Sequence, residues 1–227
     1  MKYVIMCGGV YQKFQIPKQL SVVNGERLVD RTIRLLKENN VQEIYITSND
    51  KRFDDCKAPR LEHNNSFICE GRTVKGYWLD AFYPDFNENE KVTFLFGDVY
   101  YTANAIKTIV DLKTDKNVLV GTSIAKNKLH KNWGEPFAYI VNDYKTFLDG
   151  IKEVKKMCDE GKLKRHPIVW ELYRYLNGLD VNVQSVKDET YVCIDDGTID
   201  VDAPSQIEEL NNRSSKLWLR MFFILII

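Results

Sequence analysis

The sequence predicts a single α/β domain with a mostly parallel, mixed sheet flanked by helices. Three observations predict it: a short apolar strand at residues 2–6 that ends in paired glycines, a strand, helix and strand within the first 50 residues, and a nearly continuous apolar strand at residues 92–96. Buried strands that alternate with amphipathic helices are typical of parallel sheets covered on both faces. The length of 227 residues fits one domain of this kind.

Composition excludes several classes of protein. The chain has 32 basic and 32 acidic residues and a sequence pI near 6.8, so it lacks the basic footprint of a nucleic-acid-binding protein. No long apolar region precedes Gly8, so neither a secretory signal nor a membrane-spanning helix is expected at the start. The cysteines are odd in number and irregularly spaced, which favours reduced thiols and a cytoplasmic location over disulfides or a metal site. They are Cys7, Cys56, Cys69, Cys158 and Cys193.

The first strand leads into a loop suited to binding phosphate. The loop contains Cys7, Gly8, Gly9, Val10 and Tyr11. Ligands bind at the carboxyl ends of strands in α/β sheets, and glycine amides there can hold phosphate oxygens. Lys13 and Lys18 would add positive charge beside them. The glycine pair alone leaves open a plain tight turn with two solvated lysines.

A strand–helix–strand unit follows. Val29, Ile33 and Leu36 fall on one face of a predicted amphipathic helix, and residues 44–47 have the β-branched character of a strand. This unit implies a parallel strand pair with a right-handed crossover. Residues 49–65 are polar and predict a loop or an irregular connection with at most a short helix.

The strand at residues 92–96 predicts a metal ligand at its end. Val, Thr, Phe, Leu and Phe suit a central strand buried on both faces, and Gly97 and Asp98 follow it directly. An aspartate at that edge can bind a divalent ion that also contacts triphosphate oxygens. The alternative is that Asp98 caps a helix starting near Ala103.

A second acidic feature lies near the end of the chain. If residues 199–202 are extended, Asp200 and Asp202 project to the same side of the strand. Such pairs also occur at exposed turns and edge strands.

The remaining elements are scaffold. Residues 118–122 and 136–140 read as strands, and residues 144–160 and 168–176 as helices that end at Gly161 and Gly178. A further helix is expected through Trp78 and Ala81. The aromatic stripe around Trp170 is expected to be core rather than a ligand-binding surface.

Taken together, these motifs resemble the nucleotidyltransferases with a GT-A-like (Rossmann-like) fold. Gly8, Gly9 and the pair Pro17–Lys18 match that family's opening signature, and residues 17–20 followed by Gly25 are most similar to its cytidylyltransferase branch. Two positions depart from the signature. Tyr11 stands where the family has a later glycine, and Lys13 stands where it has an arginine. Lysine keeps the charge of arginine without its bidentate fork.

The resemblance implies a reaction and a set of roles. It implies transfer of a nucleoside monophosphate, with CTP favoured, to a small phosphorylated acceptor with release of pyrophosphate. Lys18 would stabilise the transferring α-phosphate, and Lys13 with the loop amides would hold the β- and γ-phosphates. Mg²⁺ (or Mn²⁺) would lie on Asp98, Asp200 and Asp202. The family's acceptors are sugar phosphates, polyol phosphates, phosphocholine and phosphoglutamine, usually for bacterial capsule or surface polysaccharide biosynthesis.

The resemblance also implies substrate contacts elsewhere. Gly71, Arg72 and Thr73 would read the nucleotide base, and Gly97 would approach the nucleotide beside Asp98. A plain strand-to-helix turn is the alternative for residues 71–73. Candidate contacts to the acceptor are Trp133, Glu135 and His166, against which stands the alternative of a core tryptophan and a solvated glutamate.

Two other functions share this fold. One is a GT-A glycosyltransferase that uses a nucleotide-sugar, although its acidic doublet lies at the central strand rather than near the end of the chain. The other is a nucleotide-binding protein without activity, because the loop lacks the family's arginine. Pyrophosphate release distinguishes both from a nucleotidyltransferase.

The resemblance extends from residue 1 to about residue 212, which defines the expected domain as residues 1–212. Residues 213–227 form a polar linker and a short apolar tail. The apolar part is too short to span a bilayer as a helix. Packing on the domain, a homo-oligomer contact and a place in a membrane interface all stay open for it.

Overall fold

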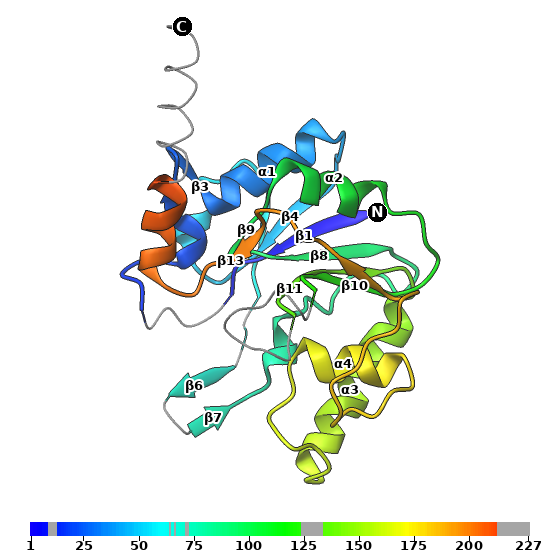
Figure 1. Ribbon diagram of the computed structural model, residues 1–227. Helices are drawn as coiled ribbons and strands as arrows, with labels where there is room; N and C mark the ends of the chain where they lie inside the picture. Colours follow the sequence, from blue (N-terminus) through cyan, green and yellow to red (C-terminus); the bar gives the residue numbers. More distant parts are fainter. Residues whose placement is uncertain (9–12, 64, 66, 71–72, 124–133, 213–227) are drawn as a thin grey trace, which may run out of the picture.

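A seven-stranded sheet with helices on both faces forms the body of the protein (Figure 1). The computed structural model describes residues 1–8, 13–63, 65, 67–70, 73–123 and 134–212. The strand order is β12-β10-β11-β8-β1-β4-β5. The strands are β1 (Lys2–Met6), β4 (Ile44–Thr47), β5 (Arg60–Leu61), β8 (Val92–Phe96), β10 (Val118–Gly121), β11 (Pro136–Val141) and β12 (Tyr191–Cys193).

Most neighbouring strands of this sheet are parallel. β1 pairs in parallel with β4 and β8, β4 with β5, and β10 with β12. β11 runs antiparallel to both β8 and β10. The predicted α/β fold with a mostly parallel, mixed sheet is therefore confirmed.

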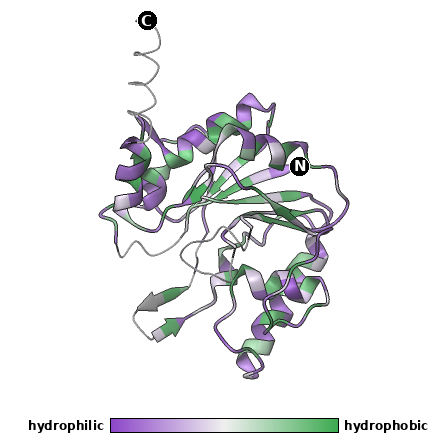
Figure 2. Cartoon of the chain, viewed as in Figure 1, coloured by the Kyte–Doolittle hydropathy of each residue, from purple (hydrophilic) through white to green (hydrophobic). Residues whose placement is uncertain are grey.

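The helices cover the two faces of the sheet as pairs. They are α1 (Leu28–Glu38), α2 (Ala103–Asp111), α3 (Tyr144–Asp159) and α4 (Val169–Leu176), and residues 204–212 are also helical. α1 packs with α2 on one face and α3 with α4 on the other (Figure 1). Figure 2 shows hydrophobic residues along the central strands and mixed colours on the helices. The apolar stripe predicted for α1 is confirmed, because Val29, Ile33 and Leu36 are all buried.

Three small two-stranded sheets complete the strands. They are β2 (Val22–Val23) with β3 (Glu26–Arg27), β6 (Ile68–Glu70) with β7 (Thr73–Lys75), and β9 (Val99–Tyr100) with β13 (Ile199–Asp200). Short 3₁₀ helices span Lys18–Leu20, Lys51–Phe53 and Trp78–Ala81. The β6–β7 hairpin extends away from the main sheet (Figure 1).

The helix expected through Trp78 and Ala81 forms only as a short 3₁₀ helix, Trp78–Ala81, and no α-helix follows it within the described residues before β8. Phe82 leaves it with extended backbone and packs its ring among Phe94, Tyr139 and Phe147, with centroids 5.0 to 6.4 Å away. Pro84 then disfavours helical backbone at the residue before it. The aromatic side chains therefore fill the core beneath the sheet instead of forming one face of a helix.

Two further expectations concern membranes and thiols. Within the described ranges, no helix has the length and apolar character needed to cross a membrane. Cys56, Cys158 and Cys193 are free thiols, as predicted. The tail at residues 213–227 lies outside the described residues, so its role and the domain boundary at 212 stay predictions.

Candidate active site

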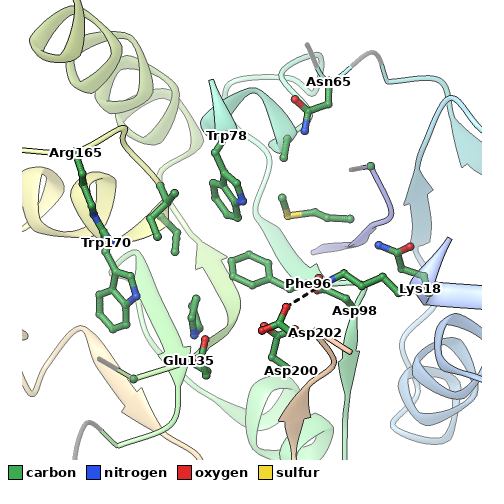
Figure 3. A pocket seen from close by; sticks show the side chains of 18 residues that line it. Lys18, Asn65, Trp78, Phe96, Asp98, Glu135, Arg165, Trp170, Asp200 and Asp202 are labelled. Carbon is green, nitrogen blue, oxygen red and sulfur yellow. Dashed lines mark hydrogen bonds and ion pairs between the residues drawn. The ribbon is translucent and has the colours of Figure 1, made fainter. Parts of the chain in front are cut away.

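A cleft of about 590 Å³ opens at the carboxyl ends of β1 and β8. Its size falls within the range of small-molecule sites. Its lining includes Lys18, Asp98, Asp200 and Asp202 on one side and Glu135, Arg165 and Trp170 on the other (Figure 3). Gly8 and Trp78 are also part of the lining. The cleft therefore lies at the sheet edge where the sequence placed a ligand.

A glycine lets the ends of β1 and β8 meet. A Cβ atom on Gly97 would lie 2.4 Å from the Met6 carbonyl oxygen and 2.9 Å from the Cys7 sulfur. The Gly97 N–H donates instead to Met6 O at 3.1 Å. Close approach at this point brings Asp98 beside the opening loop. Cys7, predicted to bind the nucleotide, is fully buried in the core and does not line the cleft.

Lys18 contacts two of the predicted metal-binding carboxylates. Its Nζ lies 2.6 Å from Asp98 Oδ2 and 3.4 Å from Asp202 Oδ1. Burial alone would lower the pKa of Lys18, but the charges of Asp98 and its acidic neighbours outweigh burial and raise it. Lys18 is therefore a fixed positive charge inside the cleft, and the alternative of a solvated lysine is wrong.

The closing acidic doublet is held against Asp98 by backbone pairing. β13 runs antiparallel to β9, and the Val201 N–H donates to Asp98 O at 3.0 Å. The Gln206 side chain accepts from Asp202 N at 2.7 Å and donates to Asp200 O at 3.0 Å. Both aspartates therefore line the cleft on the side of Lys18.

Asp200 is the most unusual group of the cluster. Its Oδ1 is buried without a hydrogen-bond partner among the described residues. Burial, followed by the charges of Asp98 and Asp202, raises the pKa of Asp200 well above its usual range, and Lys18 opposes the shift. A buried, unpaired carboxylate oxygen fits a position that a cation would occupy.

The chemistry of the cluster fits a divalent ion, although its geometry lacks an assembled ligand set. Three carboxylates meet one ammonium here, which leaves an excess of negative charge. No group of three His, Cys, Asp or Glu side chains among the described residues is arranged to hold a metal ion. Lys18 Nζ lies between two of the carboxylates, Asp98 and Asp202.

The capping alternative for Asp98 is wrong. The N-cap of α2 is Thr102, whose side chain accepts a hydrogen bond from Ala105 N at 3.0 Å. Asp98 faces Lys18 instead.

Two glycines place Glu135 on the far side of the cleft. A Cβ on Gly121 would lie 2.4 Å from Glu135 O, and a Cβ on Gly134 would lie 2.5 Å from Thr122 O. Thr122 N donates to Glu135 O, and Glu135 N donates to Thr122 Oγ1, both at 2.9 Å. Backbone contact at the start of β11 thus fixes Glu135 in the lining.

His166 does not line the cleft. Its ring stacks between Phe67 and Tyr77, with centroids 5.5 and 5.4 Å away. Burial lowers the pKa of His166, an effect that Asp80 and Glu171 oppose. Its placement beside the cleft wall makes it a packing residue between the β6–β7 region and the segment before α4.

The other predicted site residues lie in two groups. Gly9, Val10, Tyr11, Gly71, Arg72 and Trp133 lie outside the described residues. Lys13 and Thr73 are described and exposed, and neither lines the cleft. Thr73 begins β7 and pairs with Glu70 in the hairpin.

Sequence reasoning missed Arg165 and the cleft-lining role of both tryptophans. Trp170 is only 2% exposed, as expected for core, yet it also lines the cleft with Trp78. The signal for Arg165 was a basic loop segment just before Pro167, since loops often carry binding residues. In that segment the sequence analysis selected only His166 as a candidate contact.

The overall fold is similar to that of solved structures of known type. One, described as a glucose-1-phosphate thymidylyltransferase from Bacillus anthracis, has a TM-score of 0.57 and 13% identity, covering 93% of this chain and 94% of that one. The chain has a nucleotidyltransferase fold. A second, the 4-diphosphocytidyl-2C-methyl-D-erythritol synthase from Anaerococcus prevotii, has a TM-score of 0.56 and 13% identity, covering 94% of this chain and 95% of that one. No family model and no curated protein sequence matches the chain.

Proposed function

We propose that this protein is a nucleotidyltransferase that joins a nucleoside monophosphate to a small phosphorylated acceptor and releases pyrophosphate. The observation that carries the proposal is the convergence of Lys18, Asp98 and the doublet Asp200 and Asp202 in one cleft. These residues come from three segments far apart in the sequence. Their meeting at the carboxyl edge of the sheet supports a site for a triphosphate and a cation.

The chain's own residues suit an in-line attack by an acceptor phosphate oxygen on the α-phosphorus. Such transfer depends on positioning and charge neutralisation more than on a covalent nucleophile. Lys18 would leave its carboxylates to contact the α-phosphate, while the amides of the Gly8 turn and Lys13 would hold the β- and γ-phosphates. Glu135 would contact the acceptor from the opposite side.

A divalent cation completes this proposal. Asp98, Asp200 and Asp202 would hold Mg²⁺ or Mn²⁺, which when bound neutralises phosphate charge and orients the two substrates. The partnerless Asp200 oxygen and the excess of carboxylates support this assignment.

The substrates follow from the resemblance. CTP is favoured because residues 17–20 are similar to the cytidylyltransferase branch. One of the two similar structures is named as a thymidylyltransferase, and the name of the other contains a cytidyl group. The two names therefore point to different bases, and the preference for CTP rests on residues 17–20 alone. A sugar phosphate, polyol phosphate, phosphocholine or phosphoglutamine acceptor, a role in capsule biosynthesis and a cytoplasmic location belong to the same proposal.

Release of pyrophosphate tests the proposal directly. The full chain is incubated with each of the four nucleoside triphosphates, Mg²⁺ and a panel of phosphorylated acceptors from the four classes. We expect release only with one triphosphate and one acceptor class together. In a parallel incubation with a nucleotide-sugar, cleavage of that substrate without pyrophosphate release would indicate the glycosyltransferase. Triphosphate binding with no release for any acceptor would indicate a nucleotide-binding protein without activity.

A further inference from the structure

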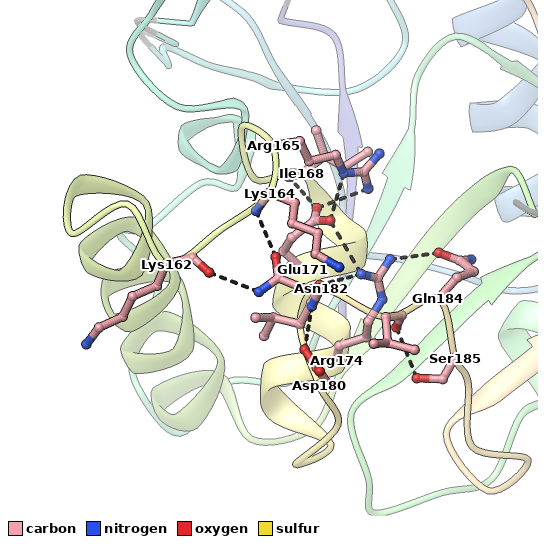
Figure 4. A network of polar contacts seen from close by, with 12 residues as sticks. Lys162, Lys164, Arg165, Ile168, Glu171, Arg174, Asp180, Asn182, Gln184 and Ser185 are labelled. Carbon is pink, nitrogen blue, oxygen red and sulfur yellow. Dashed lines mark hydrogen bonds and ion pairs between the residues drawn. The ribbon is translucent and has the colours of Figure 1, made fainter.

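On the cleft wall across from Lys18, the guanidinium of Arg165 is held in place by a buried carboxylate. Arg165 lines the cleft, and its side chain is 35% exposed. Its Nε lies 2.8 Å from Glu171 Oε1, and its Nη2 lies 3.1 Å from Glu171 Oε2 (Figure 4). Because this pairing is bidentate, it fixes the plane of the guanidinium as well as its position.

Glu171 is itself fixed by other groups. It is 2% exposed on α4, and its Oε2 accepts from the Ile168 backbone N–H at 3.0 Å. Arg174 Nη1 lies 3.5 Å from Glu171 Oε1, and the Arg174 guanidinium also donates to Gln184 Oε1 at 2.8 Å. One carboxylate therefore serves two guanidiniums. This cluster presents positive charge to the cleft through Arg165.

The surroundings of Arg165 strengthen its attraction for an anion. Trp170 and Ile168 line the cleft beside it, and Figure 3 shows Arg165 next to Trp170, on the side of the cleft away from Lys18 and Asp98. The planar donor array of a guanidinium matches the oxygens of a phosphate or carboxylate, and the neighbouring Ile168 and Trp170 side chains carry no negative charge that would repel the anion.

We propose that Arg165 binds an oxyanion of the acceptor, a phosphate or a carboxylate, and that Glu171 is the residue that positions it. The identity of the ligand as the acceptor rests on the proposed function, which assigns the triphosphate to the side of Lys18. The anion site itself stands on the Arg165, Glu171 and Arg174 contacts.

Calorimetric titration tests the site without turnover. Glycerol 3-phosphate offers a phosphate alone, and 3-phosphoglycerate adds a carboxylate. For Arg165→Gln, we expect the Kd of at least one probe to rise about 10- to 100-fold, the effect of losing a charge-assisted hydrogen bond. The Kd of CTP should stay within about twofold in the same variant. A rise for both probes assigns the phosphate, and a rise for 3-phosphoglycerate alone assigns the carboxylate.

Two variants separate the specific contact from general charge. Lys164→Gln removes a neighbouring exposed lysine that does not line the cleft, and it should leave both Kd values unchanged. Arg165→Lys keeps the charge without the fork and should restore only part of the affinity. Glu171→Gln should weaken the probes but not CTP, whereas a merely structural role would weaken both.

The outcomes are distinct from those of the pyrophosphate screen. The proposal is overturned if the parent binds neither probe, if Arg165→Gln leaves both Kd values unchanged, or if Lys164→Gln weakens binding equally. Probe binding that depends on Arg165, combined with no pyrophosphate release for any acceptor, would keep the anion site and reject the nucleotidyltransferase.

Discussion

Lys18 is the residue on which the charge balance of the cleft depends. Its ammonium lies within 3.4 Å of carboxylates from two different segments, Asp98 and Asp202. The same ammonium that pairs with these two carboxylates would contact the transferring phosphate when substrate enters. A single side chain would thus hold the carboxylates together in one state and stabilise the transferring phosphate in the other.

Lys18→Ala should lower turnover by about 10²- to 10³-fold, because a charge partner of the transition state is lost. The fold should survive, since the side chain lies in the cleft. Steady-state assay of pyrophosphate release with saturating substrates measures the effect. Lys107→Ala is the matched control, since Lys107 is 65% exposed on α2 and pairs only locally with Asp111. Near-normal turnover of Lys18→Ala would remove Lys18 from the mechanism.

His166 contributes to stability in a pH-dependent way. Its pKa is lowered in the folded chain, chiefly by burial between Phe67 and Tyr77. The unfolded chain therefore binds the proton more readily. This contribution is fully present above the ordinary histidine pKa of about 6.5 and is lost as pH falls toward the lower folded value.

His166→Phe keeps an aromatic ring in the stack and removes this titration. We expect the melting temperature of the variant to fall less than that of the parent between about pH 7 and pH 5, while the two differ little above about pH 7. Thermal denaturation at several pH values measures this. Equal acid sensitivity of the two proteins would show that His166 does not titrate on unfolding.

At the scale of elements, the absence of a side chain at Gly97 determines how closely the end of β8 approaches β1. Gly97 joins β8 to Asp98, and its missing side chain leaves room for the Met6 carbonyl. Gln19 Cγ would lie 3.1 Å from the added Cβ, so the segment that carries Lys18 is also in contact. The distance between Lys18 and Asp98 depends on this one close approach.

Gly97→Ala should destabilise the protein by about 1–3 kcal/mol or more, since backbone must shift to admit the methyl group. It should also reduce activity through displacement of Asp98. Gly8→Ala is the matched control in the same cleft, because among the described residues its Cβ would meet only the Asn65 side chain, at ordinary distances of 3.7 and 3.9 Å. Chemical denaturation compares the two. A Gly97→Ala variant as stable as Gly8→Ala would contradict the packing argument.

Elements with a strong hydrophobic pattern could be predicted from the sequence, and elements set by tertiary contact could not. β4 and β8 have the predicted bounds, because β-branched and aromatic residues fill strands that are buried on both faces. β5 and β12 are two and three residues long and form only by pairing with β4 and β10. The β2–β3 hairpin did carry a readable signal, since Asn24 and Gly25 have positive φ as in a tight hairpin turn.

The candidate site followed the same division. Asp98 follows a glycine at a strand end, Asp200 and Asp202 alternate along an extended segment, and Lys18 belongs to the Pro17–Lys18 pair after the glycine loop. Their sequence context therefore predicted them. Arg165 has no such context, because its place in the cleft is set by a bidentate contact to Glu171 on the following helix.

At the scale of the whole molecule, the cleft is lined by segments that lie far apart in the sequence, since Asp200 and Asp202 join residues from the ends of β1 and β8. β13 pairs with β9, and the following helix at residues 204–212 lies near β3 and the start of α1 (Figure 1). Val201 and Leu210 pack with Val23 and Leu28 in a second small core. Asp200 and Asp202 are therefore held in place both by the pairing of β13 with β9 and by the packing of their neighbours on Val23 and Leu28.

A divalent ion bound by Asp98, Asp200 and Asp202 would link these distant segments further. A ligand that binds only the folded state raises the melting temperature, so Mg²⁺ or Mn²⁺ should stabilise the parent by a few degrees and chelator should reverse this along with activity. Asp98→Asn should lose the stabilisation by metal. Without metal its melting temperature should stay close to that of the parent, because relief of carboxylate repulsion offsets the loss of the ion pair with Lys18.

Asp200→Asn and Asp202→Asn should differ in severity. Asp200 has a buried oxygen with no hydrogen-bond partner in the described part of the chain, whereas the Asp202 side chain is 57% exposed. We therefore expect Asp200→Asn to abolish the metal-dependent rise in melting temperature and to be the more stable variant without metal, because it removes the more buried charge. Asp111→Asn, on the exposed face of α2, is the control and should respond to metal like the parent. The metal site would be contradicted if activity persists in excess chelator or if Asp200→Asn responds to metal like the parent. Lys18, and not a metal ion, would then be the cation that balances the carboxylates.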